Sequence, residues 1–157
     1  MSRCGLALLL FATARLAAAE YESVHTYDPA RDAVEDIAAA AAEAKRTDRL
    51  VLVEVGGEWC VWCHRLDAFL KENPDLAELL ERNFVLVKVN YSPENRNEAA
   101  LGRYPAIFGY PHFFVLDGEG RLLRSQGTGE LEKGESYDKD VVRRFLEADW
   151  AKQPATP

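Results

Sequence analysis

Residues 50–66 read LVLVEVGGEWCVWCHRL and change within one short segment from a strand pattern to a helix pattern. The first six residues are apolar except for Glu54, as in a strand that is covered on both faces. Gly56 and Gly57 interrupt this run, and from Cys60 onward the apolar residues recur at helical spacing. The sequence therefore predicts a buried strand, a glycine turn and a helix whose first turn carries Cys60 and Cys63.

The position of these two cysteines has chemical consequences. The first turn of a helix has unpaired N–H groups and the positive end of the helix dipole, and both stabilise a thiolate. The pKa of a cysteine, about 8.5 when unperturbed, can fall to between ~3.5 and ~7.5 in such a place. Two cysteines three residues apart lie within one turn and can form a disulfide. We expect Cys60 to be the exposed nucleophile and Cys63 to be the buried resolving thiol.

The length and the composition indicate one domain that follows an N-terminal leader segment. The chain has 157 residues, and with 48% hydrophobic residues it can bury a core of its own. Residues 1–19 contain Arg3, an apolar run and a final Ala-Ala-Ala, which predicts a signal peptide that is cleaved to leave a domain of residues 20–157. Arg15 interrupts the apolar region, so an uncleaved anchor stays an alternative, although a full membrane span needs ~20 apolar residues.

The predicted mature domain is acidic and has few cysteines. Without Arg3 and Arg15 it keeps 17 of the 19 basic residues against 26 acidic ones, a net charge of −9. This charge argues against nucleic acid and anionic membranes as partners, and we expect no membrane insertion after cleavage. Cys4 would leave with the signal peptide, so only Cys60 and Cys63 would remain. A structural disulfide framework would use more cysteines at longer spacings.

The remaining segments alternate between helical and extended patterns. Helices are expected at residues 28–47, 60–72, 75–82 and 139–150, the first capped by Asp28 with Pro29 at its first position. Strands are expected at residues 50–55, 84–90, 112–117 and 121–126, with a hairpin turn at 117–120 and a short strand around 23–26. Strand–helix–strand crossovers imply parallel pairing and the hairpin implies an antiparallel edge. The expected fold is α/β, with a mixed central sheet of about four to five strands and helices on both faces.

Two motifs in this order resemble the thioredoxin superfamily over roughly residues 30–150. The first is Glu58-Trp59-Cys60-Val61-Trp62-Cys63 after an apolar strand, and the second is Ile107-Phe108-Gly109-Tyr110-Pro111 before the next buried strand. The Trp-Cys-x-Trp-Cys-His form is similar to secreted bacterial thioredoxin-like proteins. The resemblance implies a thioredoxin fold, a redox-active dithiol and a cis proline packed against it. Cytosolic thioredoxin has Gly-Pro between its cysteines, and this departure leaves the preferred redox direction open.

Four residues near the dithiol are predicted to bind substrate. A cis bond before Pro111 would project the backbone of Tyr110 toward the dithiol, where it could pair with an extended substrate. The alternative is an ordinary trans proline that starts an edge strand. Trp59 is expected to shield the dithiol and to offer a docking face, and Trp62, between the cysteines, is expected to be partly exposed and to contact substrate. Simple packing is the alternative for both tryptophans.

Two charged residues occupy strand positions where apolar residues are expected. Glu54 lies six residues before Cys60, where the family usually has a buried aspartate, and burial would raise the pKa of its carboxyl group. It could then accept the proton of Cys63, through water, when the mixed disulfide resolves. Lys88 matches a family lysine that partners this carboxylate. The alternative is that one or both side chains point into solvent.

The three histidines are less informative. His64 either tunes the thiolate or is a solvated residue on a helix turn. His112 follows Pro111, and the sequence leaves open whether it lies near the dithiol. His25 is interpreted as a structural or surface residue.

Other functions were weighed against the redox hypothesis. Cys60-Val61-Trp62-Cys63-His64 also matches the attachment motif of c-type haem, but the only methionine is Met1 and small cytochromes are mostly helical. A structural zinc site needs about four ligands, which this chain does not group together. A non-catalytic binding module has no need of two thiols.

The sequence thus predicts a thiol–disulfide oxidoreductase of the cell envelope, periplasmic or secreted. Its substrates would be protein thiols and disulfides, with reduction slightly favoured, and it would use no cofactor and no metal. A membrane or soluble redox partner would supply electrons.

Overall fold

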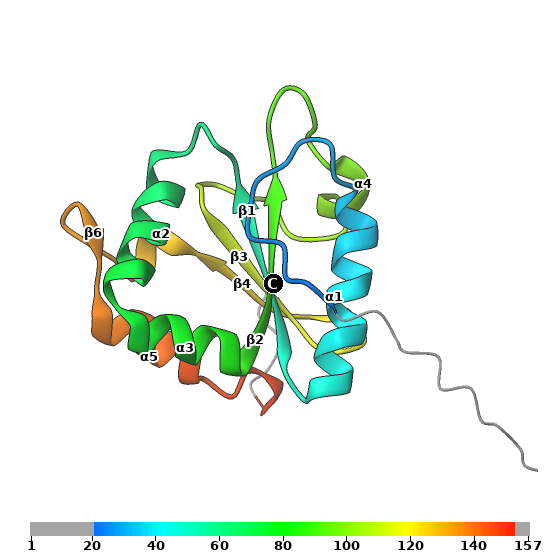
Figure 1. The fold of residues 1–157 in the computed structure, drawn as a ribbon. Coiled ribbons are helices and arrows are strands. Elements are labelled where there is room, and N and C mark those ends of the chain that lie inside the picture. Colours follow the sequence, from blue (N-terminus) through cyan, green and yellow to red (C-terminus); the bar gives the residue numbers. More distant parts are fainter. Residues whose placement is uncertain (1–20, 153–157) are drawn as a thin grey trace, which may run out of the picture.

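The computed structural model describes residues 21–152 and shows a four-stranded sheet between two layers of helices (Figure 1). The predicted signal peptide and the last residues of the tail lie outside the described residues. The helices are α1 (Ala33–Thr47), α2 (Val61–Glu72), α3 (Pro74–Asn83), α4 (Glu98–Leu101) and α5 (Lys139–Glu147), with 3₁₀ turns η1 (Thr128–Leu131) and η2 (Trp150–Lys152). The strands are β1 (Leu50–Gly56), β2 (Phe84–Asn90), β3 (His112–Leu116), β4 (Leu122–Gly127), β5 (Glu132–Lys133) and β6 (Ser136–Tyr137).

The central sheet is mixed, as predicted. Its order is β2-β1-β3-β4, with β1 parallel to β2 and antiparallel to β3, and with β4 as the antiparallel edge strand. Glu54 lies opposite Lys88 in the parallel pair and opposite Phe113 in the antiparallel pair. Because helices pack on both sides of the sheet, both faces of β1 are covered, which explains its almost continuous apolar sequence.

The alternation of side chains along β1 separates two apolar cores. Val51, Val53 and Val55 pack on the side of α1 and α4. Leu52 packs with residues of α2, α3 and α5 on the opposite side, and these three helices form the left-hand layer in Figure 1. Glu54 has the same parity as Leu52, so this carboxylate projects into the layer that holds the dithiol helix.

Three expected element boundaries are wrong. Helix α1 begins at Ala33 rather than near Asp28, because the carboxylate of Asp32 accepts the N–H groups of Val34 and Glu35 and caps the helix. Asp28 instead accepts the N–H of Ala30 in a preceding turn. The expected loop at 127–138 contains η1 and the short β5–β6 hairpin, and the last helix ends at Glu147 rather than at residue 150.

The segment before α1 runs beside strand β2 and then crosses into the helix (blue in Figure 1). Only Val24 makes a bridge, in parallel with Val87, and the N–H of Lys88 donates to the carbonyl of Val24. The expected strand at residues 23–26 is therefore reduced to one bridge. This contact fixes the segment at the sheet edge, so that Tyr27 reaches the cysteines.

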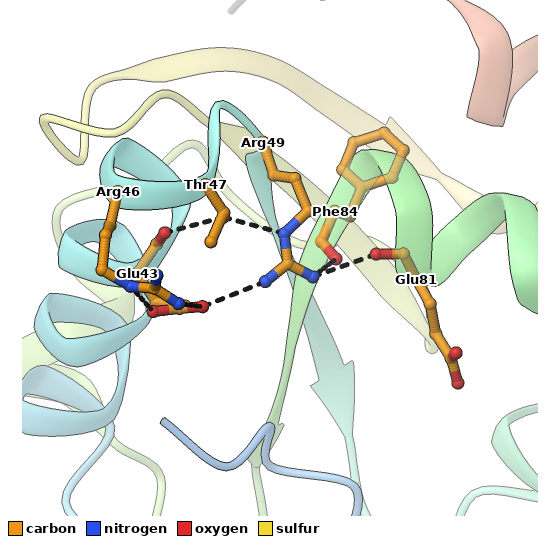
Figure 2. A network of polar contacts seen from close by, with 6 residues as sticks. All are labelled: Glu43, Arg46, Thr47, Arg49, Glu81 and Phe84. Carbon is orange, nitrogen blue, oxygen red and sulfur yellow. Dashed lines mark hydrogen bonds and ion pairs between the residues drawn. The ribbon is translucent and has the colours of Figure 1, made fainter. Parts of the chain in front are cut away.

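A second group of contacts, centred on Arg49, ties the helices to the start of the sheet (Figure 2). Its guanidinium donates to Thr47 Oγ1 at 2.9 Å and to Glu43 Oε1 at 3.2 Å, both at the end of α1. It also donates to the carbonyl oxygens of Glu81 at 3.0 Å and Phe84 at 3.3 Å, at the junction of α3 and β2. One side chain thus connects α1, β1, α3 and β2.

Among residues 21–152, no helix has both the length and the apolar composition that crossing a bilayer requires.

Candidate active site

The two cysteines lie where the loop after β1 enters α2. Cys60 is the N-cap of α2, and its Sγ accepts the N–H of Cys63 at 3.1 Å. Cys60 and Cys63 are joined in a disulfide, with their Cα atoms 5.3 Å apart. The glycine turn, the N-cap position and the three-residue spacing together place both sulfurs at the positive end of the helix.

The burial of the two cysteines differs from the expectation in one respect. Cys63 is fully buried, as expected, but Cys60 is only 4% exposed, so the prediction of an exposed Cys60 is wrong for this oxidised state. The reason is an aromatic cover: Tyr27 packs with both cysteines in one buried cluster, and Trp62 and Tyr110 pack against that cluster.

Glu54 is buried beneath the dithiol helix and has two close polar neighbours. The hydroxyl of Tyr27 donates to Glu54 Oε1 at 2.5 Å, and Lys88 Nζ lies 3.9 Å from the same oxygen. Burial raises the pKa of the Glu54 carboxyl, while Lys88 and the Tyr27 hydrogen bond oppose this shift and Asp67 adds to it. A carboxylate with a raised pKa is a stronger base, which suits proton transfer.

Lys88 lies closer to a carboxylate that the sequence analysis did not single out. Its Nζ is 2.5 Å from Asp67 Oδ1 on α2, and it also lies 4.9 Å from the centre of the Tyr27 ring. The side chain of Lys88 is buried, so the alternative of a solvent-facing lysine does not hold. Lys88 thus bridges Asp67 and Glu54.

Sequence reasoning missed Asp67 and Tyr27. Asp67 follows Cys63 by four residues on the same helix, and this spacing could have placed it on the dithiol side. Tyr27 gave no such signal, because its position depends on the path of the N-terminal segment along β2. Burial, followed by the nearby Glu54, raises the pKa of Tyr27 far above its ordinary value, so its hydroxyl stays protonated.

A cluster of aromatic side chains packs near the disulfide and includes Tyr110 from the loop that precedes β3. The Tyr110–Pro111 bond is cis, and the carbonyl of Pro111 accepts the hydroxyl of Thr128 at 2.6 Å. The Tyr110 ring stacks on Tyr91, with centroids 5.4 Å apart, and meets Trp59 edge-on at 5.3 Å. Trp59 donates its indole N–H to the carbonyl of Tyr91 at 2.8 Å, yet remains 52% exposed.

Trp62 is held differently from Trp59. It is half-buried and packs edge-on against Tyr137, with centroids 5.7 Å apart, while the guanidinium of Arg65 lies over its ring at 4.5 Å. The hydroxyl of Tyr137 donates to the carbonyl of Trp62 at 3.1 Å. Trp62 therefore forms part of a packed wall and is only partly exposed.

The three histidines occupy different environments. His64 is exposed, with Nε2 2.7 Å from the carbonyl oxygen of Glu58. His112 is buried on β3, where Nε2 lies 2.9 Å from Ser125 Oγ and burial lowers its pKa. Its ring packs on Phe114, which belongs to the α1 side of the sheet. His25 is exposed, in agreement with a surface role.

Two pockets flank the site. One, of about 640 Å³, lies beside Trp59 and is lined also by Tyr27, Tyr91 and Pro93. The other, of about 530 Å³, reaches Glu54, Asp67 and Lys88. Within the described residues, no three His, Cys, Asp or Glu side chains are grouped closely enough to hold a metal ion.

Comparisons with known proteins agree with this geometry. The model of a family described as thioredoxin-like matches residues 32–118, more than half of the chain. The thiol:disulfide interchange protein DsbD of Escherichia coli strain K12 is 25% identical over 88 residues, which are 56% of this chain. The same protein of Citrobacter koseri is 27% identical over 81 residues, or 52% of this chain. These matches span only 15% and 14% of the two relatives.

A solved structure is similar over a larger share of both chains. The crystal structure of a disulphide isomerase from Xylella fastidiosa Temecula1 matches with a TM-score of 0.65 and 27% identity. The match covers 76% of this chain and 92% of that one.

Proposed function

This chain belongs to the thioredoxin-like family of thiol–disulfide oxidoreductases, and from that premise we propose that it exchanges disulfides with proteins of the cell envelope through Cys60 and Cys63. The observation that carries the proposal is the disulfide at the N-terminus of α2, which packs against Tyr110 and against Tyr27, the hydrogen-bond partner of the buried Glu54. The names of the similar proteins, a thiol:disulfide interchange protein and a disulphide isomerase, support the same class of substrate.

The reaction has two exchange steps. In the reducing direction the Cys60 thiolate attacks a substrate disulfide, forms a bond to one substrate sulfur and releases the other as a thiolate. The Cys63 thiol then loses its proton to Glu54, and its sulfur attacks Cys60. This closes the Cys60–Cys63 disulfide and releases the second substrate sulfur, so two electrons have passed from the dithiol to the substrate. The reverse sequence oxidises a substrate dithiol.

Reduction is the direction that we favour, and it requires an electron donor. The buried pair of Glu54 and Lys88 resembles the pair of thioredoxin, which acts as a reductant, and this resemblance slightly favours reduction. A membrane or soluble redox partner would return the oxidised dithiol to its reduced form. The expected signal peptide of residues 1–19 and the relatives' thiol–disulfide chemistry support a periplasmic or secreted location.

Substrate contact is proposed for the aromatic border of the disulfide. The exposed Trp59 forms an edge-on pair with the half-buried Tyr110, and the backbone before Pro111 can pair with an extended peptide. Trp62 also packs against the cysteine cluster and would contact the same substrate at its exposed edge.

Insulin reduction, with a Cys60→Ser variant alongside, tests the function. The wild type should turn over insulin disulfides and Cys60→Ser should not, whereas Cys63→Ser should accumulate a mixed disulfide through Cys60. Equal activity of wild type and Cys60→Ser would contradict the mechanism, and unchanged partner binding by that variant would favour a binding module.

The reduction potential of the couple separates the two directions. A value near about −270 mV is typical of a reductant and one near ~−120 mV of an oxidant. The c-type haem alternative predicted a mostly helical fold, which the mixed α/β fold does not match, and purified protein with a Soret band would still favour it.

A further inference from the structure

Tyr27 contacts both Cys63 and Glu54, the two groups between which the exchange mechanism must move a proton. It comes from the segment before α1 and is 4% exposed. On one side its hydroxyl donates to Glu54 Oε1 at 2.5 Å. On the other side the ring packs with Cys60 and Cys63 in one buried cluster. The proton of Cys63 must reach Glu54, and the Tyr27 hydroxyl is already bonded to that carboxylate.

The space around Gly56 shows how close the hydroxyl and the sulfur are. A methyl group built on the Cα of Gly56 would lie 2.5 Å from Cys63 Sγ and 2.9 Å from Tyr27 Oη. Both atoms thus border the same small volume at the end of β1. Only a glycine leaves that volume empty, so the sulfur and the hydroxyl can approach each other there.

We propose that the Tyr27 hydroxyl passes the proton of the Cys63 thiol to the Glu54 carboxylate when the mixed disulfide resolves, an inference that rests on the proposed function. The S–H bond of Cys63 breaks and its proton bonds to Tyr27 Oη, while the hydroxyl proton moves to Glu54. The freed electron pair of Cys63 forms the bond to Cys60, and the bond from Cys60 to the substrate breaks. The substrate leaves as a thiolate that takes a proton from water, and Tyr27 ends unchanged.

The groups around Glu54 favour a Tyr27 hydroxyl that passes a proton on, and they disfavour a Tyr27 that ionises and acts as a base itself. The groups that face Glu54 are Tyr27 from the N-terminal segment, Lys88 from β2 and Asp67 from α2, with Tyr137 of β6 further away. The strongly raised pKa of Tyr27 means that the hydroxyl cannot act by ionising. It can still accept one proton while giving up another, because both transfers then occur together and no tyrosinate forms.

The proton has a route from Glu54 to solvent. The pocket of about 530 Å³ is lined by Glu54, Asp67 and Lys88, whereas neither cysteine nor Tyr27 lines it. The side chain of Asp67 is 47% exposed and contacts Lys88. Glu54 thus contacts Tyr27 on the side of the dithiol and borders the pocket on the other, although its side chain is only 2% exposed, and its proton leaves through that pocket after each turnover.

The test is single-turnover exchange by Tyr27→Phe, which keeps the ring and removes the hydroxyl. Reduced protein is mixed with a peptide disulfide, quenched in acid, and the mixed disulfide through Cys60 is quantified by mass spectrometry. Attack by Cys60 should stay within about twofold of wild type. Resolution by Cys63 should slow by at least about tenfold at pH 6.5, since general acid–base steps contribute ~10²–10⁴-fold. The deficit should shrink toward pH 9, where the thiol ionises without a relay.

Tyr137→Phe is the matched control. Tyr137 is also buried, and its hydroxyl donates to the carbonyl of Trp62 rather than to Glu54. This variant should resolve the mixed disulfide at the wild-type rate. An equal slowing in Tyr137→Phe, or a folded Tyr27→Phe with the wild-type rate and pH profile, overturns the relay.

The double variant with Glu54→Gln tests whether the two groups act as one path. If they do, Tyr27→Phe combined with Glu54→Gln is no slower than the slower single variant, whereas independent roles make the two factors multiply and overturn the relay. A wild type that exchanges no disulfides, like Cys60→Ser, is a different result, because it removes the proposed function itself.

A measurement on the wild type decides the question if Tyr27→Phe does not fold. Resolution rates are measured in mixtures of H₂O and D₂O. The relay moves two protons in one step, the thiol proton and the hydroxyl proton, so the rate should depend on the deuterium fraction along a quadratic curve. A linear dependence indicates one moving proton and overturns the relay.

Discussion

At the scale of single residues, Gly56 shows how tightly the site is packed. A Cβ at this position would lie 2.5 Å from Cys63 Sγ and 2.9 Å from Tyr27 Oη, closer than real Cβ contacts. We predict that Gly56→Ala lowers the free energy of unfolding of the oxidised protein by about 1–3 kcal/mol, the usual cost of overpacking a core. Urea unfolding followed by tryptophan fluorescence measures it.

Gly129→Ala is the control for this substitution. Nothing lies within 4 Å of a Cβ at Gly129, which is exposed in η1. The free energy of unfolding should change by no more than about 0.5 kcal/mol. Equal effects of the two alanines would show that crowding at the disulfide does not cause the loss of stability at Gly56.

Glu54 predicts a specific dependence of stability on pH. Burial raises the pKa of its carboxyl above the ordinary value of 4.5, so between these two values the folded protein holds a proton that the unfolded chain has lost. The free energy of unfolding then falls as pH rises through that window, by at most about 1.4 kcal/mol per pH unit. The full stabilising contribution of Glu54 is present only below its ordinary pKa. Relative to Glu54→Gln, the wild type should therefore become less stable from pH 4.5 upward.

Urea unfolding of both oxidised proteins at pH 4.5, 6 and 7.5 checks this sign. Groups that are common to both chains cancel in the difference, so the comparison isolates Glu54. A difference that stays constant over this range, or that grows in favour of the wild type, would mean that Lys88 outweighs burial.

The residues of the site were predictable from sequence to different degrees. Glu54 and Lys88 interrupt apolar strands, and such interruptions are visible without a structure. The cover over Cys60 was not visible, because Tyr27 is 33 residues away along the chain and its position depends on one bridge between Val24 and Val87. Periodicity describes which face a residue occupies within an element, but not where an irregular segment crosses the sheet.

At the scale of elements, Arg49 holds together four of them (Figure 2). Its planar guanidinium donates to Thr47 and Glu43 on one side and to the carbonyls of Glu81 and Phe84 on the other. Lysine has one nitrogen and cannot reach both sides at once. We predict that Arg49→Lys lowers the free energy of unfolding by about 1–3 kcal/mol, as expected for lost hydrogen bonds to a charged group.

Arg121→Lys is the comparison for this prediction, again by urea unfolding. Arg121 is 74% exposed and pairs with Asp117 and Glu119 at the surface. Exposed ion pairs contribute about 0–1 kcal/mol, so this substitution should cost clearly less than Arg49→Lys. If the two cost the same, Arg49 does not connect the elements energetically.

The long elements were predictable and the short ones were not. Strand β2 has the expected bounds, and α2 differs from the expected range by one residue at its start and α3 by one residue at each end, because their apolar patterns are strong. The start of α1 was misplaced because Asp28-Pro29 is a favourable helix start in sequence, whereas in the structure Asp32 caps the helix and Asn95 donates to the carbonyls of Pro29 and Arg31 in the preceding turn. The β5–β6 hairpin is too short to show any alternation.

At the scale of the whole molecule, the large exposed apolar side chains of the described residues belong to the two sequence segments that form the redox site. The large hydrophobic residues that are exposed within residues 21–152 are Trp59, Val61 and Phe108. Two of them flank Cys60, and Phe108 lies two residues before Tyr110, whose ring contacts Trp59. The chain as a whole has a net charge of −7. An apolar surface beside the reactive sulfurs favours unfolded or extended protein substrates over small polar disulfides.

Phe108 is the side chain that tests this preference, because it is 96% exposed and supports nothing in the folded chain. Phe108→Ser should leave the free energy of unfolding within about 0.5 kcal/mol of wild type. It should lower kcat/KM for insulin reduction about tenfold, since burying a phenylalanine against a substrate contributes at least ~1.5 kcal/mol. For oxidised glutathione, which is small and polar and offers no apolar side chain to Phe108, kcat/KM should hardly change. The ratio of the two constants is the decisive measurement: if Phe108→Ser lowers both equally, the loop shapes the dithiol itself, and if it lowers neither, protein substrates dock elsewhere.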